Sequence, residues 1–178
     1  MNNAIYIFFK IIFYFSKQRE EYINKLFRHK GMKIGKDCRI YSNILTGESY
    51  LITIGDNVTI SNNVQFITHD NSIIKINQQY TDIFGEIKIG ENVFIGARTI
   101  ILPGVELNKN IIVGSGSVVT KSFLEENIII AGNPAKKIRT INEEYRKKVS
   151  NFGLNINGLN NEKKKELIHC SKESFIKR

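Results

Sequence analysis

Between residues 88 and 121, in KIGENVFIGARTIILPGVELNKNIIVGSGSVVTK, an apolar side chain recurs at every sixth position. An α-helix turns by about 100° per residue, so a six-residue step would move the apolar position by about 240° and spread these side chains around the helix. Glycine and proline within the stretch also oppose a helix. An extended chain instead keeps positions six apart on one face. The apolar positions are Ile89, Ile95, Ile101, Leu107, Val113 and Val119.

The repeat therefore predicts very short strands joined by tight turns. Glycines directly follow Ile89, Ile95 and Val113, where the chain must bend without a side chain in the way. Three strands and three turns make one coil of about 18 residues, and coils stack at about 4.8 Å so that each buries its neighbour's inward row. The predicted fold class is mostly β, a parallel β-helix, with the same pattern less clean between Ile34 and Phe66.

The pattern breaks twice, over residues 41–53 and in a long excursion between His69 and Glu86. A loop of that length inside a compact repeat is usually functional or disordered. A solenoid also leaves polar backbone at its ends, which predicts capping by terminal helices. The predicted organisation is N-terminal helices over residues 1–33, a β-helix over 34–140 with an acceptor loop at 70–86, and a basic helical extension over 141–178.

The N-terminal stretch AIYIFFKIIFYF, residues 4–15, is apolar apart from one lysine. A spanning helix needs about 20 residues, and the stretch has neither the basic leader nor the cleavage site of a signal peptide. We expect a helix that docks on the protein's own oligomer or lies at a membrane interface. The next segment pairs Ile23 with Phe27 at helical spacing and ends at Gly31, which predicts an amphipathic helix. Two more short helices are expected in EEYRKKV and EKKKELIHC.

The formal net charge of +9 is concentrated in the two ends of the chain. Residues 1–33 carry +5 and residues 136–178 carry +7, whereas residues 34–135, which contain the repeat, carry −3. A nucleic-acid-binding protein would need a basic stripe with interleaved aromatic side chains on its folded surface. The repeat region lacks both, so we expect no nucleic-acid partner and favour small anionic molecules or a membrane surface.

Cysteine usage indicates a reducing compartment. Cys38 and Cys170 lie far apart in the sequence and show no spacing typical of metal ligands. Neither a disulfide framework nor a zinc site is predicted, and we expect the protein in the cytoplasm.

Four motifs in this chain resemble one family: IGENVFIGARTIILPGV, VGSGSVVTK, the exit AGNPAKKIR, and GESYLITIGDNVTI leading into FITHD. From Ile34 to Thr140 the sequence resembles the hexapeptide-repeat acyltransferases of left-handed parallel β-helix fold. The similar branch acetylates sugars and related acceptors from acetyl-CoA, and includes galactoside, capsular, lipopolysaccharide-sugar and streptogramin acetyltransferases. The left hand follows from this resemblance alone, because parallel crossovers are normally right-handed. The resemblance also implies a homotrimer with active sites between neighbouring chains.

Acetyl transfer to a hydroxyl requires a base for the hydroxyl proton. His69 follows an apolar strand at the edge of the loop, whereas His29 and His169 lie in charge-rich helical segments. The residue pattern alone also fits a polar corner residue; the resemblance implies that His69 is the base. Asp70 either orients its imidazole or caps the turn. Glu48 precedes His69 by slightly more than one coil, which predicts a place on the adjoining coil; the resemblance puts it near the acceptor, and a turn carboxylate facing water is the alternative.

The resemblance also suggests where the substrates bind. It places the pantetheine arm of coenzyme A along Ala97 and Ser115, which are separated by one full coil and therefore lie at equivalent corners of successive coils. Tyr80 and Phe84 either line the acceptor pocket or pack against a neighbouring subunit. Arg98 departs from the family pattern, where this position is small or neutral. The residues matching the adenosine and phosphate end are Thr120, Lys121, Lys136 and Arg139.

The predicted function is that of an acetyl-CoA-dependent O-acetyltransferase acting on a sugar hydroxyl in the biosynthesis of a surface polysaccharide, capsule or lipopolysaccharide. Residues 4–15 allow peripheral contact with the inner face of the membrane. The alternatives are an N-acetyltransferase of an amino sugar or nucleotide sugar, an antibiotic acetyltransferase, and a non-catalytic trimeric scaffold. No metal is expected, because a metal-dependent hydratase on this coil would need several histidines and the repeat has one.

Overall fold

The computed structural model describes residues 19–44 and 46–176. Residues 4–15, for which a docking or interfacial helix is predicted, lie outside this part of the chain. The chain forms two compact units, Met1–Thr140 and Ile141–Arg178, each described by itself below. Within the described ranges, no helix combines the length and apolar character needed to cross a membrane.

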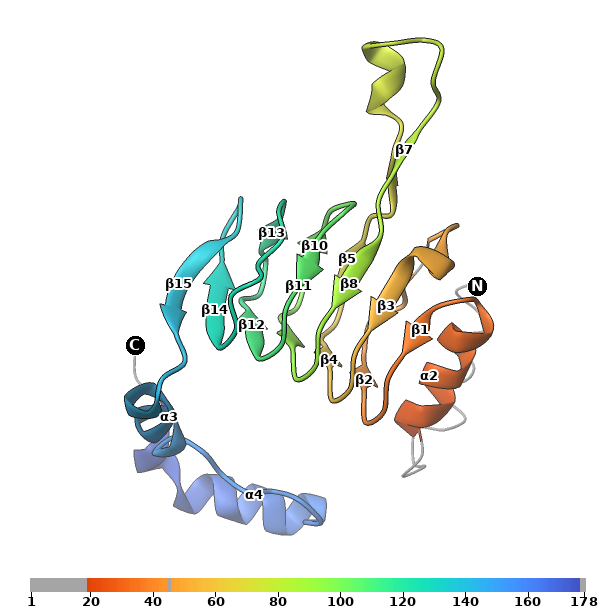
Figure 1. The fold of residues 1–178 in the computed structure, drawn as a ribbon. Coiled ribbons are helices and arrows are strands. Elements are labelled where there is room, and N and C mark those ends of the chain that lie inside the picture. The colour runs from red at the N-terminus through yellow and green to blue at the C-terminus, as the bar shows by residue number, and fades with distance from the viewer. Residues whose placement is uncertain (1–18, 45, 177–178) are drawn as a thin grey trace. The chain divides into compact units, whose positions relative to one another are not determined.

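The first unit is a parallel β-helix whose strands stack into three sheets (Figure 1). Two of the sheets are parallel throughout, and the third ends in an antiparallel strand. The four-stranded sheet holds β1 (Lys33–Ile34), β3 (Ile52–Ile54), β8 (Ile87–Ile89) and β11 (Glu106–Leu107); the three-stranded sheet holds β5 (Gln65–Phe66), β10 (Ile100–Ile101) and β13 (Val118–Val119). The six-stranded sheet holds β2 (Arg39–Ile40), β4 (Thr59–Ile60), β9 (Phe94–Ile95), β12 (Ile111–Val113), β14 (Ile128–Ala131) and the antiparallel β15 (Lys136–Thr140).

The strand register confirms the predicted coil length. Ile89 pairs with Leu107 and Ile95 pairs with Val113. Paired inward residues are therefore three six-residue steps apart, which is the length of one predicted coil. Ile54 instead pairs with Ile89, which makes this coil almost twice as long as the regular one. The excess is the excursion after Thr68, and the sheets continue in register on both sides of it.

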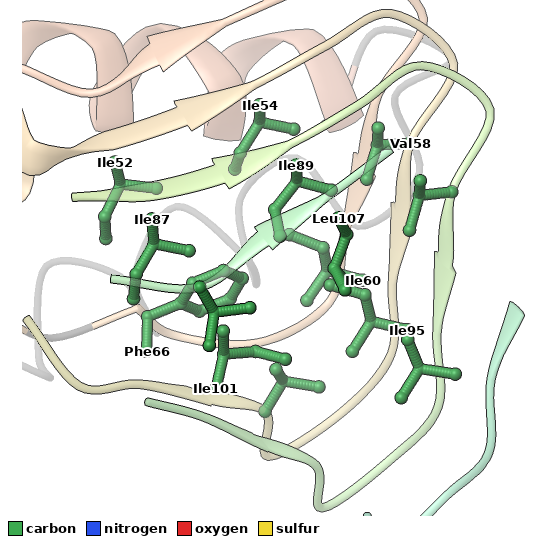
Figure 2. Close-up of a cluster of buried hydrophobic side chains, with 14 of the residues drawn as sticks. Ile52, Ile54, Val58, Ile60, Phe66, Ile87, Ile89, Ile95, Ile101 and Leu107 are labelled. Atoms are coloured by element: carbon green, nitrogen blue, oxygen red, sulfur yellow. The ribbon is translucent and has the colours of Figure 1, made fainter. Parts of the chain in front are cut away.

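The six-spaced side chains point into the coil, as the period predicts. All six positions are at most 2% exposed, and Ile101 is fully buried. Figure 2 shows how the inward residues of successive coils stack in a continuous apolar column. Burial of one such side chain contributes about 1.5–3 kcal/mol to folding. The second inward row, two residues before each position, is buried as well: Val93, Thr99, Val105, Ile111 and Ser117.

Two glycines of the repeat, Gly90 and Gly96, are required by the close approach of successive coils. Gly90 and Gly96 stand at corners but do not adopt left-handed backbone angles. A Cβ atom built on Gly96 would lie 2.5 Å from the backbone nitrogen of Ser115 in the next coil, so glycine permits close approach of the coils. The left-handed bend falls two residues later, on Asn92 (φ 54°) and Arg98 (φ 60°).

Asparagine suits one of these corners because its short polar side chain tolerates the left-handed region. Asn57, Asn92 and Asn110 occupy that corner in successive coils, all with positive φ. Asn57 Nδ2 donates to Asn92 Oδ1 at 2.8 Å, and Asn92 Nδ2 donates to Asn110 Oδ1 at 2.8 Å. This ladder links neighbouring coils along one edge of the β-helix.

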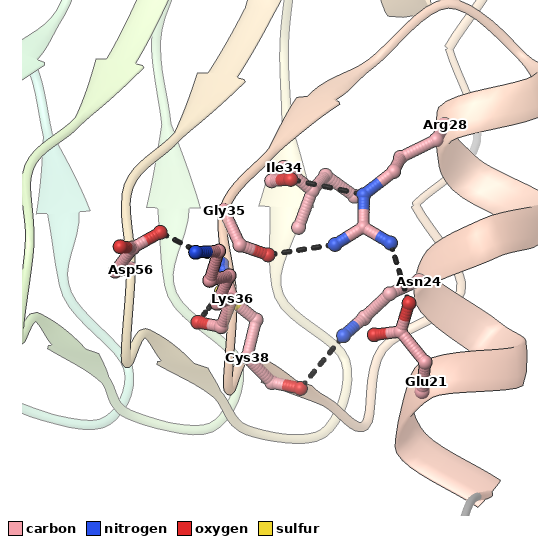
Figure 3. Close-up of polar contacts among 8 residues, drawn as sticks. All are labelled: Glu21, Asn24, Arg28, Ile34, Gly35, Lys36, Cys38 and Asp56. Atoms are coloured by element: carbon pink, nitrogen blue, oxygen red, sulfur yellow. Dashed lines mark hydrogen bonds and ion pairs between the residues drawn. The ribbon is translucent and has the colours of Figure 1, made fainter.

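Helix α2 (Arg19–His29) covers the first coil, as predicted for a capping element. Its Ile23 and Phe27 are buried in the core. Arg28 and Asn24 satisfy backbone carbonyls of the first coil (Figure 3). The bonds run from Arg28 Nε to Ile34 O at 2.9 Å, from Arg28 Nη2 to Gly35 O at 2.7 Å, and from Asn24 Nδ2 to Cys38 O at 2.8 Å.

An arm leaves the β-helix after β5, and Figure 1 shows it projecting away from the stacked coils. Its base is an antiparallel pair, β6 (His69–Asp70) and β7 (Ile83–Phe84), in which His69 faces Phe84. A short 3-10 helix, η2 (Ser72–Lys75), lies between the two strands. The other break in the repeat contains the 3-10 helix η1 (Ser49–Leu51).

The second unit consists of α3 (Glu143–Ser150), α4 (Asn161–Cys170) and the short η3 (Lys172–Ser174). Asparagines begin both α-helices: Asn142 accepts from Tyr145 N and Asn160 accepts from Lys163 N, each at 2.9 Å. No residue described in this unit is buried. The helices are therefore held by local capping rather than by a core of their own.

Candidate active site

His69 stands at the root of the arm. The preceding Thr68 is 1% exposed and continues the inward row of β5, and its carbonyl accepts from Gly85 N at 3.0 Å, which closes the base of the arm. The His69 side chain is 47% exposed, and its ring centroid lies 5.9 Å from that of Phe84. The imidazole is thus fixed at its base and accessible from outside.

Glu48 reaches the same imidazole from the other break in the repeat. It lies immediately before η1, and its Oε2 atom is 2.9 Å from His69 Nδ1. The Thr68 hydroxyl donates to the same oxygen at 2.7 Å. The hydrogen bond from Thr68, followed by that from His69, lowers the pKa of Glu48 below its usual value. The two departures from the period, far apart in sequence, therefore meet at one pair of side chains.

The pair suits His69 to remove a proton. An ionised carboxylate only accepts hydrogen bonds, so Nδ1 of His69 is the donor in this contact. In the neutral imidazole the lone pair then resides on Nε2. A group with this arrangement can act as a general base toward a ligand on its exposed side, and the carboxylate stabilises the imidazolium that results.

Asp70 caps a turn in this structure. Its Oδ1 accepts from Ser72 N at 2.7 Å, at the start of η2, and this backbone hydrogen bond is the main cause of its lowered pKa. Of the two roles considered for Asp70, this contact corresponds to the turn cap. The carboxylate bonded to the imidazole is that of Glu48.

Tyr80 and Phe84 lie on the arm but at different distances from the candidate base. Phe84 faces His69 across the β6–β7 pair, whereas Tyr80 lies beyond η2. Phe84 is 60% exposed, Tyr80 is 59% exposed, and Ile76 on the same arm is 83% exposed. The arm thus exposes apolar side chains, and one of them, Phe84, lies next to the imidazole.

Two threonines near Glu48 are not among the site residues predicted from the sequence. Thr68 and Thr46 contact each other through their hydroxyls, and both contact Glu48 Oε2. The position of Thr68 in the sequence could have revealed them. Thr68 follows the inward-pointing Phe66 by two residues, so a hydroxyl side chain occupies an inward position. A buried hydroxyl at a core position needs a partner, which points to a polar neighbour.

The predicted coenzyme positions fall on two edges of the β-helix. Ala97 and Ser115 lie at the bend between the six-stranded and three-stranded sheets, the Ala97 corner, where Gly116 N donates to Ala97 O at 2.8 Å. His69, Thr120 and Lys121 follow strands of the three-stranded sheet and lie at its other bend, the His69 corner. Within one chain, the Ala97 corner and the His69 corner are different edges.

The remaining basic positions lie near the C-terminal end of the β-helix. Lys136 and Arg139 belong to β15 and pair with Ala131 and Ile129 of β14. Lys121 Nζ lies 5.7 Å from the centroid of the Phe123 ring. All three basic side chains are exposed.

Comparison with known proteins agrees with this architecture. The family model described as the hexapeptide repeat of succinyl-transferase matches residues 31–65 and 86–121, the segments on either side of the arm. The chain is similar to this family over those two segments. The predicted resemblance and the predicted fold class, a left-handed parallel β-helix with short terminal helices, are thereby confirmed.

Similar proteins include Protein CapG of Staphylococcus aureus, 45% identical over 91 residues, which are 48% of this chain and 51% of that protein. The chain thus spans about half the length of this relative. A maltose O-acetyltransferase from Clostridium difficile 630 is 28% identical, with a TM-score of 0.55 over 72% of this chain and 78% of its own. A galactoside acetyltransferase in complex with coenzyme A is 32% identical, with a TM-score of 0.57 over 65% and 58%.

Proposed function

We propose that the protein is an acetyl-CoA-dependent O-acetyltransferase that acts on a sugar hydroxyl. The observation that carries this proposal is the Glu48–His69 pair, held at 2.9 Å with its imidazole accessible at the root of the arm. The similar proteins named as a maltose O-acetyltransferase and a galactoside acetyltransferase support both the reaction and the acceptor class.

In the proposed reaction His69 is the general base. Acetyl-CoA supplies the acetyl group as a thioester. His69 Nε2 removes the proton of the acceptor hydroxyl while the hydroxyl oxygen bonds to the acetyl carbonyl carbon, and it returns this proton to the departing sulfur. Glu48 remains ionised and stabilises the transient imidazolium. Base catalysis of this kind contributes about 10²–10⁴ to the rate.

The proposed coenzyme contacts are Ala97 and Ser115 for the pantetheine arm and the exposed Thr120, Lys121, Lys136 and Arg139 for the adenosine and phosphates. The residues present fit such a ligand, because a Cβ atom built on Gly116, beside Ser115, would meet no atom within 4 Å. Backbone groups at this corner are therefore approachable, and the exposed basic side chains can neutralise phosphate charge.

We further propose a homotrimer with the active site between neighbours. The proposed base lies at the His69 corner and the proposed pantetheine positions at the Ala97 corner, which are separate edges of one chain. A threefold assembly would bring the His69 corner of one chain against the Ala97 corner of the next. Light scattering should give three times the chain mass, and mixing His69→Ala chains with Ser115→Trp chains should restore part of the activity.

The proposed setting is the assembly of a surface polysaccharide in the cytoplasm, with residues 4–15 in peripheral contact with the inner membrane face. Tyr80 and Phe84 are proposed to line the acceptor site. Their position on the exposed arm beside His69 supports this assignment.

The test is a titration of acetyl-CoA by calorimetry together with thiol release in the presence of sugars, amino sugars and nucleotide sugars. We expect binding, and thiol release that requires a sugar hydroxyl and yields an alkali-labile ester. An alkali-stable amide formed from amino sugars would indicate an N-acetyltransferase instead. Absence of acetyl-CoA binding by the folded protein would contradict the proposal and leave a scaffold.

A further inference from the structure

Three side-chain groups converge on a single oxygen of Glu48. Its Oε2 atom lies 2.7 Å from Thr68 Oγ1, 2.9 Å from His69 Nδ1 and 3.3 Å from Thr46 Oγ1. The other oxygen, Oε1, makes no hydrogen bond to any residue in the described part of the chain. The two carboxylate oxygens therefore have different surroundings. Oε2, which faces His69, is also the oxygen that the threonines contact.

The protons of this cluster can be placed by counting donors. Each threonine hydroxyl has one proton, and the ionised carboxylate has none. Thr68 lies closer to Oε2 than Thr46 does, at 2.7 Å against 3.3 Å, so Thr68 gives its proton to Glu48. Its close contact with Thr46 is then formed by accepting the Thr46 proton, which is directed at Thr68 rather than at Oε2. Thr46 Oγ1 accepts in turn from Glu48 N at 3.4 Å. The hydrogen bonds thus run from Glu48 N to Thr46, from Thr46 to Thr68, and from Thr68 back to the side chain of Glu48.

We propose that Thr68, supported by Thr46, is a positioning residue that holds Glu48 Oε2 against Nδ1 of His69 and so keeps the Nε2 lone pair directed at the acceptor. The catalytic meaning of this assignment rests on the proposed acetyltransferase function. The geometric part, which concerns the tautomer of His69, does not depend on it.

Threonine suits this task because of where Thr68 lies. It is buried at an inward position of the coil, so its hydroxyl has little access to water and is committed to protein partners. Its β-branched side chain has few rotamers, which limits movement of the hydroxyl. Glu48, by contrast, lies in a turn and is 19% exposed, so its carboxylate would have freedom to swing without the two threonines.

The electrostatics of Glu48 agree with the geometry. The hydrogen bond from Thr68 is the largest cause of the lowered pKa of this carboxyl, ahead of that from His69. Removing the Thr68 hydroxyl should therefore raise the pKa of Glu48, which ¹³C NMR of the carboxyl group would measure.

The direct test is ¹⁵N NMR of the histidine side chains in the full-length protein, which has three histidines. The wild type should show His69 protonated at Nδ1 and unprotonated at Nε2 near neutral pH. Thr68→Val, which removes the hydroxyl and keeps the shape, should give a mixture of tautomers, and Thr68→Ser should restore the wild-type signal. Wild-type His69 protonated at Nε2 would overturn the proposal without the need for any variant.

Kinetics provide the second readout. Thr68→Val should lower kcat for acetyl transfer about 10–100-fold with little change in the KM for acetyl-CoA, by analogy with other groups that orient a histidine. Thr46→Val should act in the same direction to a smaller extent, and it remains informative if Thr68→Val does not fold. The matched control is Thr99→Val, another buried threonine, whose hydroxyl donates to Gly114 O at 3.3 Å at the Ala97 corner. Because this corner is proposed to hold the pantetheine arm, any loss in the control should appear in the KM for acetyl-CoA, with the His69 tautomer unchanged.

The outcomes are separable from those of the proposed function. Equal losses in Thr68→Val and Thr99→Val, with an unchanged His69 tautomer, would show that Thr68 is structural and overturn the inference. A wild-type protein with no acetyl transfer but with the Nδ1-protonated tautomer, lost in Thr68→Val, would refute the proposed function and retain the positioning role.

Discussion

The regular coils of residues 86–121 and the two breaks at residues 41–53 and 69–86 differ in what their side chains do. In the regular coils, the six-spaced side chains fill the core. In the breaks, the six-residue period is interrupted. The side chains of Glu48 and His69 form a hydrogen-bonded pair there, outside the apolar core. One region supplies the core, and the other supplies the proposed active site.

This difference follows from the geometry of a solenoid. A strictly periodic coil places the same kind of side chain at the same position on every turn, and each turn contacts only its neighbours. Extra residues release the chain from the period. The additional segment after Thr68 carries His69 and the arm, and the longer first coil carries Glu48.

The largest expected effect on stability concerns the regular coils. Leu107→Ala removes a side chain that is 1% exposed and should lower the free energy of unfolding by about 2–5 kcal/mol, measured by urea denaturation. The control is Glu106→Ala, the exposed neighbour on the same strand, with an expected change within about 0.5 kcal/mol. Similar losses in both variants would mean that the inward row does not hold the fold together.

Replacing the arm should separate stability from acceptor recognition. His69 faces Phe84, so residues 70–83 can be exchanged for Asn-Gly, which forms a two-residue hairpin turn between them. We expect the free energy of unfolding to change by about 1 kcal/mol or less, because the sheets are in register on both sides of the arm. Acetyl-CoA should still bind, whereas the KM for the sugar should rise. Collapse of the β-helix in this variant would contradict the division between the two regions.

The smallest expected effect is on the pH dependence of stability. The pKa of Glu48 is lower in the folded state than in the unfolded state. At pH values above the unfolded-state pKa, the ionised carboxylate therefore stabilises the folded state. This stabilisation is lost as the pH falls through the folded-state pKa. Glu48→Gln should therefore be less stable than the wild type at pH 7, and urea denaturation should show the gap closing as the pH falls below the usual pKa of glutamate. A gap that stays constant with pH would contradict the assigned hydrogen bonds.

The period of the sequence was sufficient to predict most of the fold. It indicated the coil length, the inward rows and the place of the arm, because an apolar residue at every sixth position has few other physical solutions. The capping helix was readable from Ile23 and Phe27 at helical spacing. The reason for the glycines was not, because the close approach between Gly96 and Ser115 is a contact between successive coils.

The candidate site was only partly readable. His69 and Glu48 could be named from the motifs, but their contact depends on how two irregular segments fold toward each other, for which the sequence has no period. Thr46 and Thr68 act only through Glu48, so their part in the site appears once the carboxylate has been placed. The partner of Asp70 was likewise open until the turn at Ser72 was known.

The most direct test of the account compares turnover, coenzyme binding and stability in the wild type and His69→Ala. The side chain is 47% exposed and outside the core, so we expect little change in unfolding and unchanged acetyl-CoA binding, with thiol release in the presence of the sugar acceptor reduced about 10²–10⁴-fold. Turnover by His69→Ala equal to that of the wild type would show that the pair at the root of the arm is not the site of the chemistry.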